Sequence, residues 1–338
     1  MASLASAQVV PMDSAPALPA SPPRSVDRTL FLSTSPPPQW AVLLDVSSVA
    51  ESAQNVLIIQ HSDRVPPAFV AFFLREQHVP FVVLALDRPG AVLPPPSKPW
   101  KAIVSLGGPQ GAYEEAEHPW IAQEKRFLVD HIAHKTPILA ICLGAQMLAH
   151  ALGGKAYAAP PTAFEVGYPV VRLTDAGTKD EPIAELFERL QRGPQVAPAS
   201  ASADASASSV SSVGASTSSV SPSTPATRGF LMHHGDTFDL PSGVECLAVS
   251  DAGFKQLYRA GSALAVQFHP EASVHEIQTW TQWNPKRYEV LGTTAENIVQ
   301  QVKQQQAASF AHSEAFFETW WTKIAGFPLK QQQKQSQQ

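Results

Sequence analysis

The sequence has little cysteine, no cluster of basic residues and no long apolar run. Two cysteines in 338 residues exclude a disulfide-rich scaffold and favour a reducing compartment, so we expect the cytoplasm. A net charge of -5 without a basic block disfavours nucleic-acid binding. No apolar run reaches the roughly 18 residues of a membrane-spanning helix, so we expect no membrane segment.

The N-terminal part of the chain lacks the pattern of a secretory signal. A basic start followed by a continuous apolar core is missing. The stretch is rich in Ala and Ser and contains Arg24 and Arg28, which leaves a mitochondrial transit peptide as the alternative location, although acidic residues in the same stretch run against it. Repeated Pro and Ser predict that residues 1–40 are disordered. Residues 41–49 are apolar enough to pack, but the sequence does not place them.

The central part of the chain alternates short apolar runs with helical patterns, and 44% of all residues are apolar, enough for a sizeable core. Strands are predicted over 55–60, 80–86, 99–109 and 137–142, and helices over 67–77, 118–134 and 144–154. This alternation indicates an α/β fold with a parallel sheet covered on both faces. Closely spaced strands over 167–173, 229–236, 244–250, 254–259 and 262–270 then predict an antiparallel section, and helices follow over 294–306 and 312–325.

Two segments have a composition that is unsuited to packing. Residues 193–228 contain twelve serines, no aromatic residue and only two charges, Asp204 and Arg228. Such a segment cannot bury enough apolar surface to offset its ordering entropy. We therefore predict a domain over 54–325 that carries a disordered Ser/Ala-rich insertion in a surface loop. A Gln-rich tail is predicted over 326–338.

Cys142 lies where an apolar strand meets a helix. The small residues Gly144 and Ala145 follow it closely. A nucleophile on a tight strand-to-helix turn needs small neighbours, because the backbone passes close on both sides. The helix N-terminus would favour a thiolate at this position. A small cysteine buried in the core fits the same pattern, so this stretch alone leaves both interpretations open. Cys246, in an alternating strand pattern, is predicted to be a half-buried structural thiol.

His269 stands apart from the other histidines because it ends an apolar strand and is followed by Pro270 and Glu271. Open α/β sheets bind ligands at the carboxyl edge of their strands, where this side chain would lie. Glu271 can accept a hydrogen bond from the imidazole and fix its tautomer. A surface turn is the structural alternative. Most other histidines, His131 and His312 among them, lie in polar or helical contexts and are expected to be solvated.

The segment SLGGPQG, residues 105–111, places two glycines directly after a predicted strand. Gly107 and Gly108 can turn backbone N–H groups toward a developing oxyanion. The N–H of Leu143, the residue after the cysteine, would be a second donor. A simple glycine turn is the structural alternative.

Taken together, five segments resemble the class I glutamine amidotransferase family, over roughly residues 54–325: SLGGPQGAYEE, PILAICLGAQMLAHALGG, FEVGYPVV, MHHGDTFDLP and AVQFHPE. The similarity is greatest to the stand-alone group that resembles the glutaminase domain of GMP synthase, which has a Gln-His pair like Gln60-His61 after its first strand. The resemblance implies a three-layer, flavodoxin-like sandwich with a mostly parallel sheet and a small antiparallel extension. It implies neither a metal nor a cofactor.

The resemblance also implies a role for each matching residue. Cys142 attacks the side-chain amide of glutamine, His269 transfers the proton, Glu271 orients His269, and Gly108 and Leu143 form the oxyanion hole. Contacts to the substrate are implied for Gly107, Gln146, His233, His234 and Asp236. Two residues depart from the family pattern: Ala140 replaces a usual glycine, and His233 replaces a serine found in several relatives.

Three functions remain open at this point. The first is hydrolysis of glutamine through a cysteine thioester, with the ammonia passed to an unknown acceptor or partner protein. The second is a hydrolase or peptidase that acts on small γ-glutamyl peptides with the same residues. The third is a catalytically weak regulatory or binding module, which the complete Cys, His and Glu set disfavours. The sequence contains no Walker A motif, and only a short helical region follows His269, so no ATP-using synthetase is expected on this chain.

Overall fold

A computed structural model describes residues 42–47, 49, 51–194, 226–227 and 229–330. The predicted disordered segment 1–40, most of the predicted insertion, and the end of the predicted Gln-rich tail lie outside the described residues. Ala226–Thr227, which the prediction placed inside the insertion, form strand β9 and pair with β8.

A ten-stranded sheet forms the core, with the strand order β1-β3-β2-β4-β5-β14-β13-β12-β8-β9. Six neighbouring strands are parallel: β1 (Val42–Leu43), β3 (Phe81–Ala85), β2 (Val56–Gln60), β4 (Ala102–Ser105), β5 (Ile138–Ile141) and β14 (Ala263–Val266). The other four are antiparallel: β13 (Lys255–Ala260), β12 (Cys246–Ser250), β8 (Val171–Leu173) and β9 (Ala226–Thr227). The predicted α/β fold is confirmed, and the antiparallel strands extend the same sheet.

Two short ribbons lie beside the main sheet. β10 (Met232–His234) pairs with β7 (Glu165–Gly167), and β11 (Asp236–Asp239) pairs with β6 (Lys155–Ala158). The segment GFLMHHGD, which was predicted as one strand, therefore contributes to two ribbons. The change falls at Gly235, between β10 and β11.

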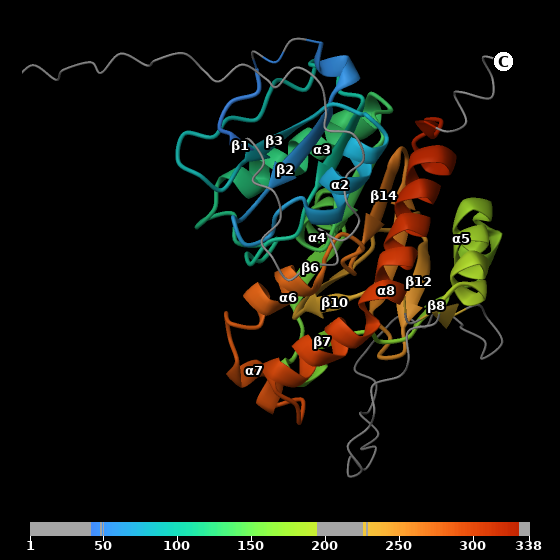
Figure 1. The fold of residues 1–338 in the computed structure, drawn as a ribbon. Coiled ribbons are helices and arrows are strands. Elements are labelled where there is room, and N and C mark those ends of the chain that lie inside the picture. Colours follow the sequence, from blue (N-terminus) through green and yellow to red (C-terminus); the bar gives the residue numbers. More distant parts are fainter. Residues whose placement is uncertain (1–41, 48, 50, 195–225, 228, 331–338) are drawn as a thin grey trace, which may run out of the picture.

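Helices cover both faces of the sheet and complete the three-layer, flavodoxin-like sandwich (Figure 1). One face carries α2 (Ala68–Glu76), α5 (Glu181–Arg192), α8 (Ala295–Thr319) and its π-helical end η4 (Trp320–Ile324); the other carries α3 (Trp120–Ala133) and α4 (Leu143–Ala151). Alternate residues of β2 explain this division, because Ile58 belongs to the first apolar cluster and Leu57 to the second. The short helices are η1 (Ser52–Gln54), η2 (Pro161–Ala163), η3 (Gly177–Lys179), α6 (Val274–Trp280) and α7 (Lys286–Glu289).

Several boundaries differ from the prediction. The helices predicted over 294–306 and 312–325 are the continuous helix α8 followed by η4, because no Pro or Gly interrupts residues 307–311. Residues 42–43, which the sequence did not place, add β1 to the edge of the parallel section. The start of the predicted tail is packed: the Phe327 ring lies 4.6 Å from that of Trp321, and the backbone N–H of Lys330 donates to Gln77.

Four adjacent parallel strands bring candidate site residues to one edge of the sheet. β2 is followed by His61, β4 by Gly107, β5 by Cys142 and β14 by His269. The carboxyl ends of parallel strands share an edge, and this edge is where open α/β sheets bind ligands. The fold therefore gathers four separate segments of the sequence into one site.

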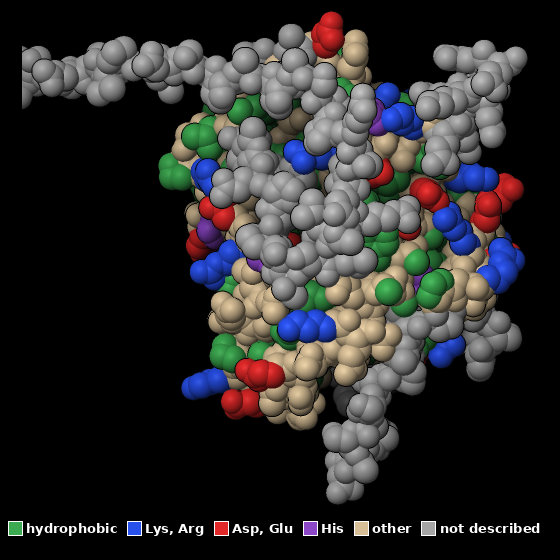
Figure 2. Space-filling model, viewed as in Figure 1, with side chains coloured by type: hydrophobic (Ala, Val, Ile, Leu, Met, Phe, Trp, Pro, Cys, Tyr) green, Lys and Arg blue, Asp and Glu red, His purple; other side chains and the backbone are tan. Residues whose placement is uncertain are grey.

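The outer surface has mixed charge. Figure 2 shows acidic and basic side chains interspersed over the coloured part of the visible face, without a large basic patch there. No helix in the described part of the chain has both the length and the apolar character needed to cross a membrane.

Candidate active site

Cys142 occupies a strained turn between β5 and α4. Its backbone angles are φ 50° and ψ -105°, a left-handed conformation that costs a non-glycine residue about 1–3 kcal/mol. The surroundings hold it there, because its N–H donates to the carbonyl of Val266 at 2.8 Å. A Cβ atom on Gly144 would lie 2.5 Å from the Ser105 hydroxyl, so only glycine lets the helix begin so close to β4. The tight turn predicted at this cysteine is present.

His269 and Glu271 lie beside this turn and are buried. The imidazole Nδ1 lies 2.7 Å from the Glu271 carboxylate, with exposed side-chain fractions of 4% and 1%. The Cys142 sulfur lies close enough to the ring to favour its charged form. Burial works against a charged imidazole, but the Glu271 carboxylate and the Cys142 sulfur outweigh it and raise the pKa of His269 to about 10. The imidazole beside the Cys142 sulfur is therefore charged near neutral pH.

Two further contacts fix the nucleophile and its base. The Gln267 side-chain amide donates to the Cys142 sulfur at 3.5 Å. The Trp280 ring packs against His269 with a centroid separation of 4.6 Å. The indole N–H of Trp280 also donates to the carbonyl of Arg64 at 2.7 Å. Trp280 therefore joins helix α6, the loop after β2 and the imidazole.

The two glycines after β4 pack tightly against the other site residues. A Cβ atom on Gly107 would lie 2.9 Å from Cε1 of His269, and one on Gly108 would lie 2.7 Å from Cδ2 of Leu143. Within the described residues, the N–H groups of Gly108 and Leu143 have no hydrogen-bond acceptor. Gly108 and Cys142 both line the same cavity, so a free backbone donor is available next to the thiol.

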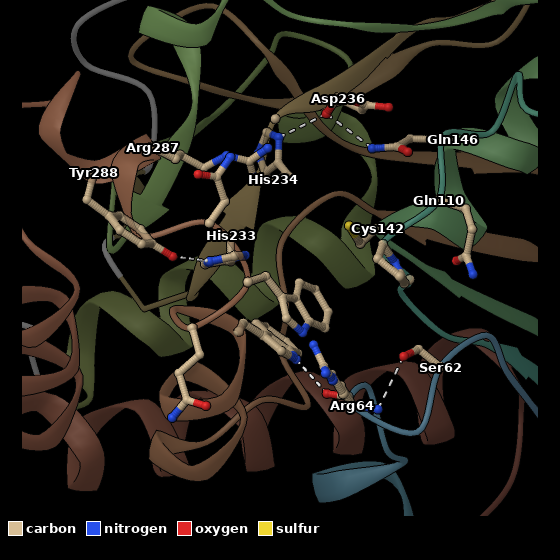
Figure 3. A pocket seen from close by; sticks show the side chains of 17 residues that line it. Ser62, Arg64, Gln110, Cys142, Gln146, His233, His234, Asp236, Arg287 and Tyr288 are labelled. Atoms are coloured by element: carbon tan, nitrogen blue, oxygen red, sulfur yellow. Dashed lines mark hydrogen bonds between the residues drawn. The ribbon is translucent and has the colours of Figure 1, made fainter.

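A cavity of about 560 Å³ opens onto Cys142 (Figure 3). Its volume falls in the range of about 300–1,000 Å³ that is typical of small-molecule sites. Four of the residues for which substrate contacts were predicted line it, Gln146, His233, His234 and Asp236, whereas Gly107 is not among the lining residues.

Gln146 and Asp236 face the cavity from α4 and β11. The Gln146 amide nitrogen donates to the backbone carbonyl of Asp236 and to the Gln267 side chain, both at 3.1 Å, which leaves its amide oxygen without a described partner (Figure 3). Burial raises the pKa of the Asp236 carboxyl, although the hydrogen bond from Tyr113 opposes this shift. The two residues offer oxygen acceptors that suit a substrate ammonium group.

The two histidines of β10 have different surroundings. Nε2 of His233 lies 2.8 Å from the Tyr288 hydroxyl, and burial lowers the pKa of His233 to about 3, so the ring is neutral (Figure 3). Nδ1 of His234 forms a hydrogen bond with the Asp236 carbonyl at 3.0 Å, and Nε2 lies 3.1 Å from the Glu165 carboxylate without a hydrogen bond to it among the described residues. His233 is therefore a neutral wall of the cavity, and His234 fixes the strand around Asp236.

The segment that contains α6 and α7 also contributes to the cavity, a role that was not predicted from the sequence. Trp280, Trp283, Arg287 and Tyr288 come from this segment, and Arg64 comes from the loop after β2. Three aromatic residues within nine positions were the signal that could have indicated a site wall. Within the described part of the chain, neither guanidinium group forms an ion pair: Arg287 lies over the Phe164 ring and Arg64 over Trp283.

Two sequence expectations about histidines are wrong. His131 and His312 are buried, with 1% and 2% of their surface exposed, because helices α3 and α8 turn these positions toward the sheet. Cys246 is half-buried in β12, as predicted, and burial raises the pKa of its thiol to about 11. Among the described residues, no three His, Cys, Asp or Glu side chains are grouped to hold a metal ion.

Comparisons with known proteins point to one family. The family model described as glutamine amidotransferase class-I matches residues 73–281. The glutamine amidotransferase-like protein YfeJ of Salmonella typhimurium is 29% identical over 107 residues, which are 31% of this chain and 44% of YfeJ. The match thus spans less than half the length of that relative.

Two solved structures share the fold. A glutamine amidotransferase from Thermotoga maritima superposes with a TM-score of 0.59 at 21% identity, covering 81% of this chain and 98% of that chain. A glutamine amidotransferase from Methylobacillus flagellatus gives a TM-score of 0.60 at 22% identity, covering 82% of this chain and 97% of that chain.

Proposed function

Because the chain belongs to the class I glutamine amidotransferase family, we propose that it hydrolyses the side-chain amide of glutamine through a thioester on Cys142. One observation carries this proposal. Cys142, in its strained turn, and Gly108 line one cavity, and the His269–Glu271 pair lies next to that turn. Among the described residues, the N–H groups of Gly108 and of Leu143, which follows the cysteine, have no acceptor. A nucleophile, an oriented base and an oxyanion site are the three parts that acyl transfer needs.

The proposed chemistry follows from the positions of Cys142, His269 and the two backbone N–H groups. The Cys142 thiolate attacks the amide carbon, and the carbonyl oxygen becomes an oxyanion that the N–H groups of Gly108 and Leu143 stabilise. The intermediate collapses with loss of ammonia, which receives its proton from Nε2 of His269. His269, now neutral and still held by Glu271, takes a proton from water. The resulting hydroxide attacks the thioester, releasing glutamate and regenerating Cys142.

The polar lining suits the amino-acid end of glutamine. The free amide oxygen of Gln146 and the carboxylate of Asp236 provide acceptors for the α-ammonium group. The guanidinium group of Arg287 lies on the same side of the cavity as His234 and Asp236 and suits the α-carboxylate (Figure 3). The neutral His233 adds a wall that does not repel the ammonium.

A second candidate function is hydrolysis of small γ-glutamyl peptides. The cavity, about 560 Å³, has room for more than free glutamine, and Arg64 offers a second guanidinium group across the cavity from Arg287 (Figure 3). A γ-glutamyl peptide carries a further carboxylate on its leaving group, which such a group would bind. The same thioester would form, with an amine leaving in place of ammonia.

The acceptor of the ammonia is also a proposal. Family members couple glutamine hydrolysis to an acceptor, and a partner protein that opens onto the cavity would receive the ammonia released at Cys142. Activity with glutamine alone would then be slow and would rise when that partner is bound.

The test is a product assay on the purified full chain. Glutamine and γ-glutamyl dipeptides are incubated separately, and glutamate, ammonia and released amino acid are measured. We expect turnover by wild type and by Cys246→Ala, which removes the other cysteine, and none by Cys142→Ala. Equal activity of Cys142→Ala and wild type would show that Cys142 is not the nucleophile. Turnover of dipeptides without turnover of glutamine would replace the first function by the second, and no turnover by wild type would favour a binding module.

A further inference from the structure

Another histidine–carboxylate pair lies against the glycine loop and does not line the cavity. Nε2 of His61 is 2.8 Å from the Glu124 carboxylate, and both side chains are completely buried. The hydroxyl of Ser105 donates to the other carboxylate oxygen at 2.7 Å. The His61 ring stacks on Trp120 with a centroid separation of 5.2 Å and an interplanar angle of 4°. The ring is therefore held in one orientation.

The other ring nitrogen of His61 reaches the glycine loop. Nδ1 lies 3.2 Å from the carbonyl oxygen of Gly107. A carboxylate and a carbonyl oxygen are both acceptors, so this ring donates from both nitrogens and carries a positive charge. Burial opposes the charge, but Glu124, the Gly107 carbonyl and the nearby Asp87 outweigh it and raise the pKa of His61.

This contact sets the direction of the predicted oxyanion donor. The carbonyl of Gly107 and the N–H of Gly108 belong to the same peptide group, which is trans. In a planar trans peptide the two bonds point in opposite directions, so a carbonyl turned toward His61 turns the N–H away from it. Gly108 lines the cavity beside Cys142, and its N–H has no acceptor among the described residues.

We propose that Glu124 and His61 are positioning residues that orient and polarise the Gly107–Gly108 peptide as an oxyanion donor. A hydrogen bond from a cation to the carbonyl draws electron density from the amide and makes its N–H a stronger donor. Neither residue lines the cavity, so the positive charge of His61, paired with Glu124, acts on the peptide group without contacting the substrate. This inference rests on the proposed glutamine hydrolysis.

Three variants separate orientation from charge. Glu124→Gln keeps the shape and removes the carboxylate charge, His61→Asn keeps a neutral donor near the Nδ1 position, and His61→Leu removes the donor. Loss of one oxyanion donor costs about 10²–10³-fold in kcat, so we expect a fall of about 100-fold for His61→Leu. We expect about tenfold for the other two, because they weaken the donor without removing it. KM should stay within about twofold in all three, since the oxyanion forms only in the transition state.

The matched control is His131→Leu. Like His61, His131 is a buried histidine, and it lies on α3, the helix that carries Glu124. It hydrogen-bonds to Thr136 just before β5, at the opposite edge of the sheet from the cavity. This variant should lose stability while keeping kcat. The proposal is overturned if Glu124→Gln loses no more kcat than His131→Leu, or if KM rises while kcat is retained. If His61→Leu does not fold, the other two variants decide the question.

A measurement on the resting protein does not depend on the substrate. Nitrogen chemical shifts of His61 should show an imidazolium at pH 7, and the amide proton of Gly108 should move upfield in Glu124→Gln as its polarisation is lost. A neutral ring in wild type, or an unmoved Gly108 signal, overturns the proposal. If the His61 ring is charged in wild type and the Gly108 signal moves in Glu124→Gln, but wild type hydrolyses no glutamine, the proposed function fails while the positioning contact stands.

Discussion

The strained turn at Cys142 predicts an unusual response to glycine. We compare Cys142→Gly with Cys142→Ala, because both lack the thiol and differ only in one methyl group. At an ordinary buried position an Ala-to-Gly change loses about 0.8 kcal/mol of burial and about 0.4–1 kcal/mol through the more flexible unfolded chain. At φ 50° and ψ -105° the glycine also releases backbone strain, worth about 1–3 kcal/mol.

At the Cys142 turn, the released strain nearly cancels the two losses. At an unstrained buried position, only the two losses remain. Ala140→Gly is the matched control, because Ala140 is fully buried in β5, two residues before the cysteine, without a positive φ. We expect Ala140→Gly to cost about 1–2 kcal/mol of unfolding free energy. Cys142→Gly should be as stable as Cys142→Ala or more stable. The difference between the two Ala-to-Gly steps then measures the strain.

Equilibrium unfolding in urea provides the assay, with tryptophan fluorescence as the signal and refolding checked for reversibility. If Cys142→Gly loses as much stability relative to Cys142→Ala as Ala140→Gly loses relative to wild type, no strain is stored at the nucleophile. The explanation of the turn given above would then be wrong.

Three further predictions concern the same site. Gly107→Ala places a methyl group against the His269 ring and should lower kcat about 100-fold in the glutamine assay; unchanged kcat would show that the ring tolerates displacement. The folded-state pKa of His269, about 10, lies above its ordinary value of 6.5, so its charged form stabilises the fold below pH 6.5 and this contribution is lost as pH rises toward 10. The melting temperature should therefore fall less between pH 6 and pH 10 in Glu271→Gln than in wild type. An equal fall in the two proteins would contradict this prediction. Iodoacetamide at pH 7.5 should label Cys142 and leave Cys246 unlabelled, because burial raises the pKa of the Cys246 thiol to about 11; peptide mapping by mass spectrometry distinguishes the two.

The parallel half of the fold could be predicted from local patterns. The strands β2 to β5 are short apolar runs bounded by helical periodicity, and their predicted ranges contain the observed ones. The cysteine turn could also be predicted, because a tight strand-to-helix turn needs a small residue such as Gly144, where a Cβ atom would lie 2.5 Å from the Ser105 hydroxyl. These signals depend on neighbouring residues in the sequence and need no knowledge of the tertiary structure.

The rest of the site depends on contacts between distant segments. Glu124 is an acidic residue on an amphipathic helix, and nothing local shows that it is buried against His61, 63 positions away. The prediction that His131 and His312 are solvated is wrong for the same reason, since helical position alone does not reveal which face packs on the sheet. The cavity wall from α6 and α7 follows an irregular course that no periodicity describes.

The strand order has a consequence for the newly made protein. The base, His269, follows strand β14, which lies between β5 and β13 in the sheet. His269 comes 127 positions after Cys142 in the chain. At a translation rate of about 5–20 residues per second, the ribosome needs roughly 6–25 s to make that stretch. During this time Cys142 has neither His269 nor Glu271 beside it. The nascent chain therefore exposes an ordinary thiol, and the reactive pair is assembled only when β14 joins the sheet.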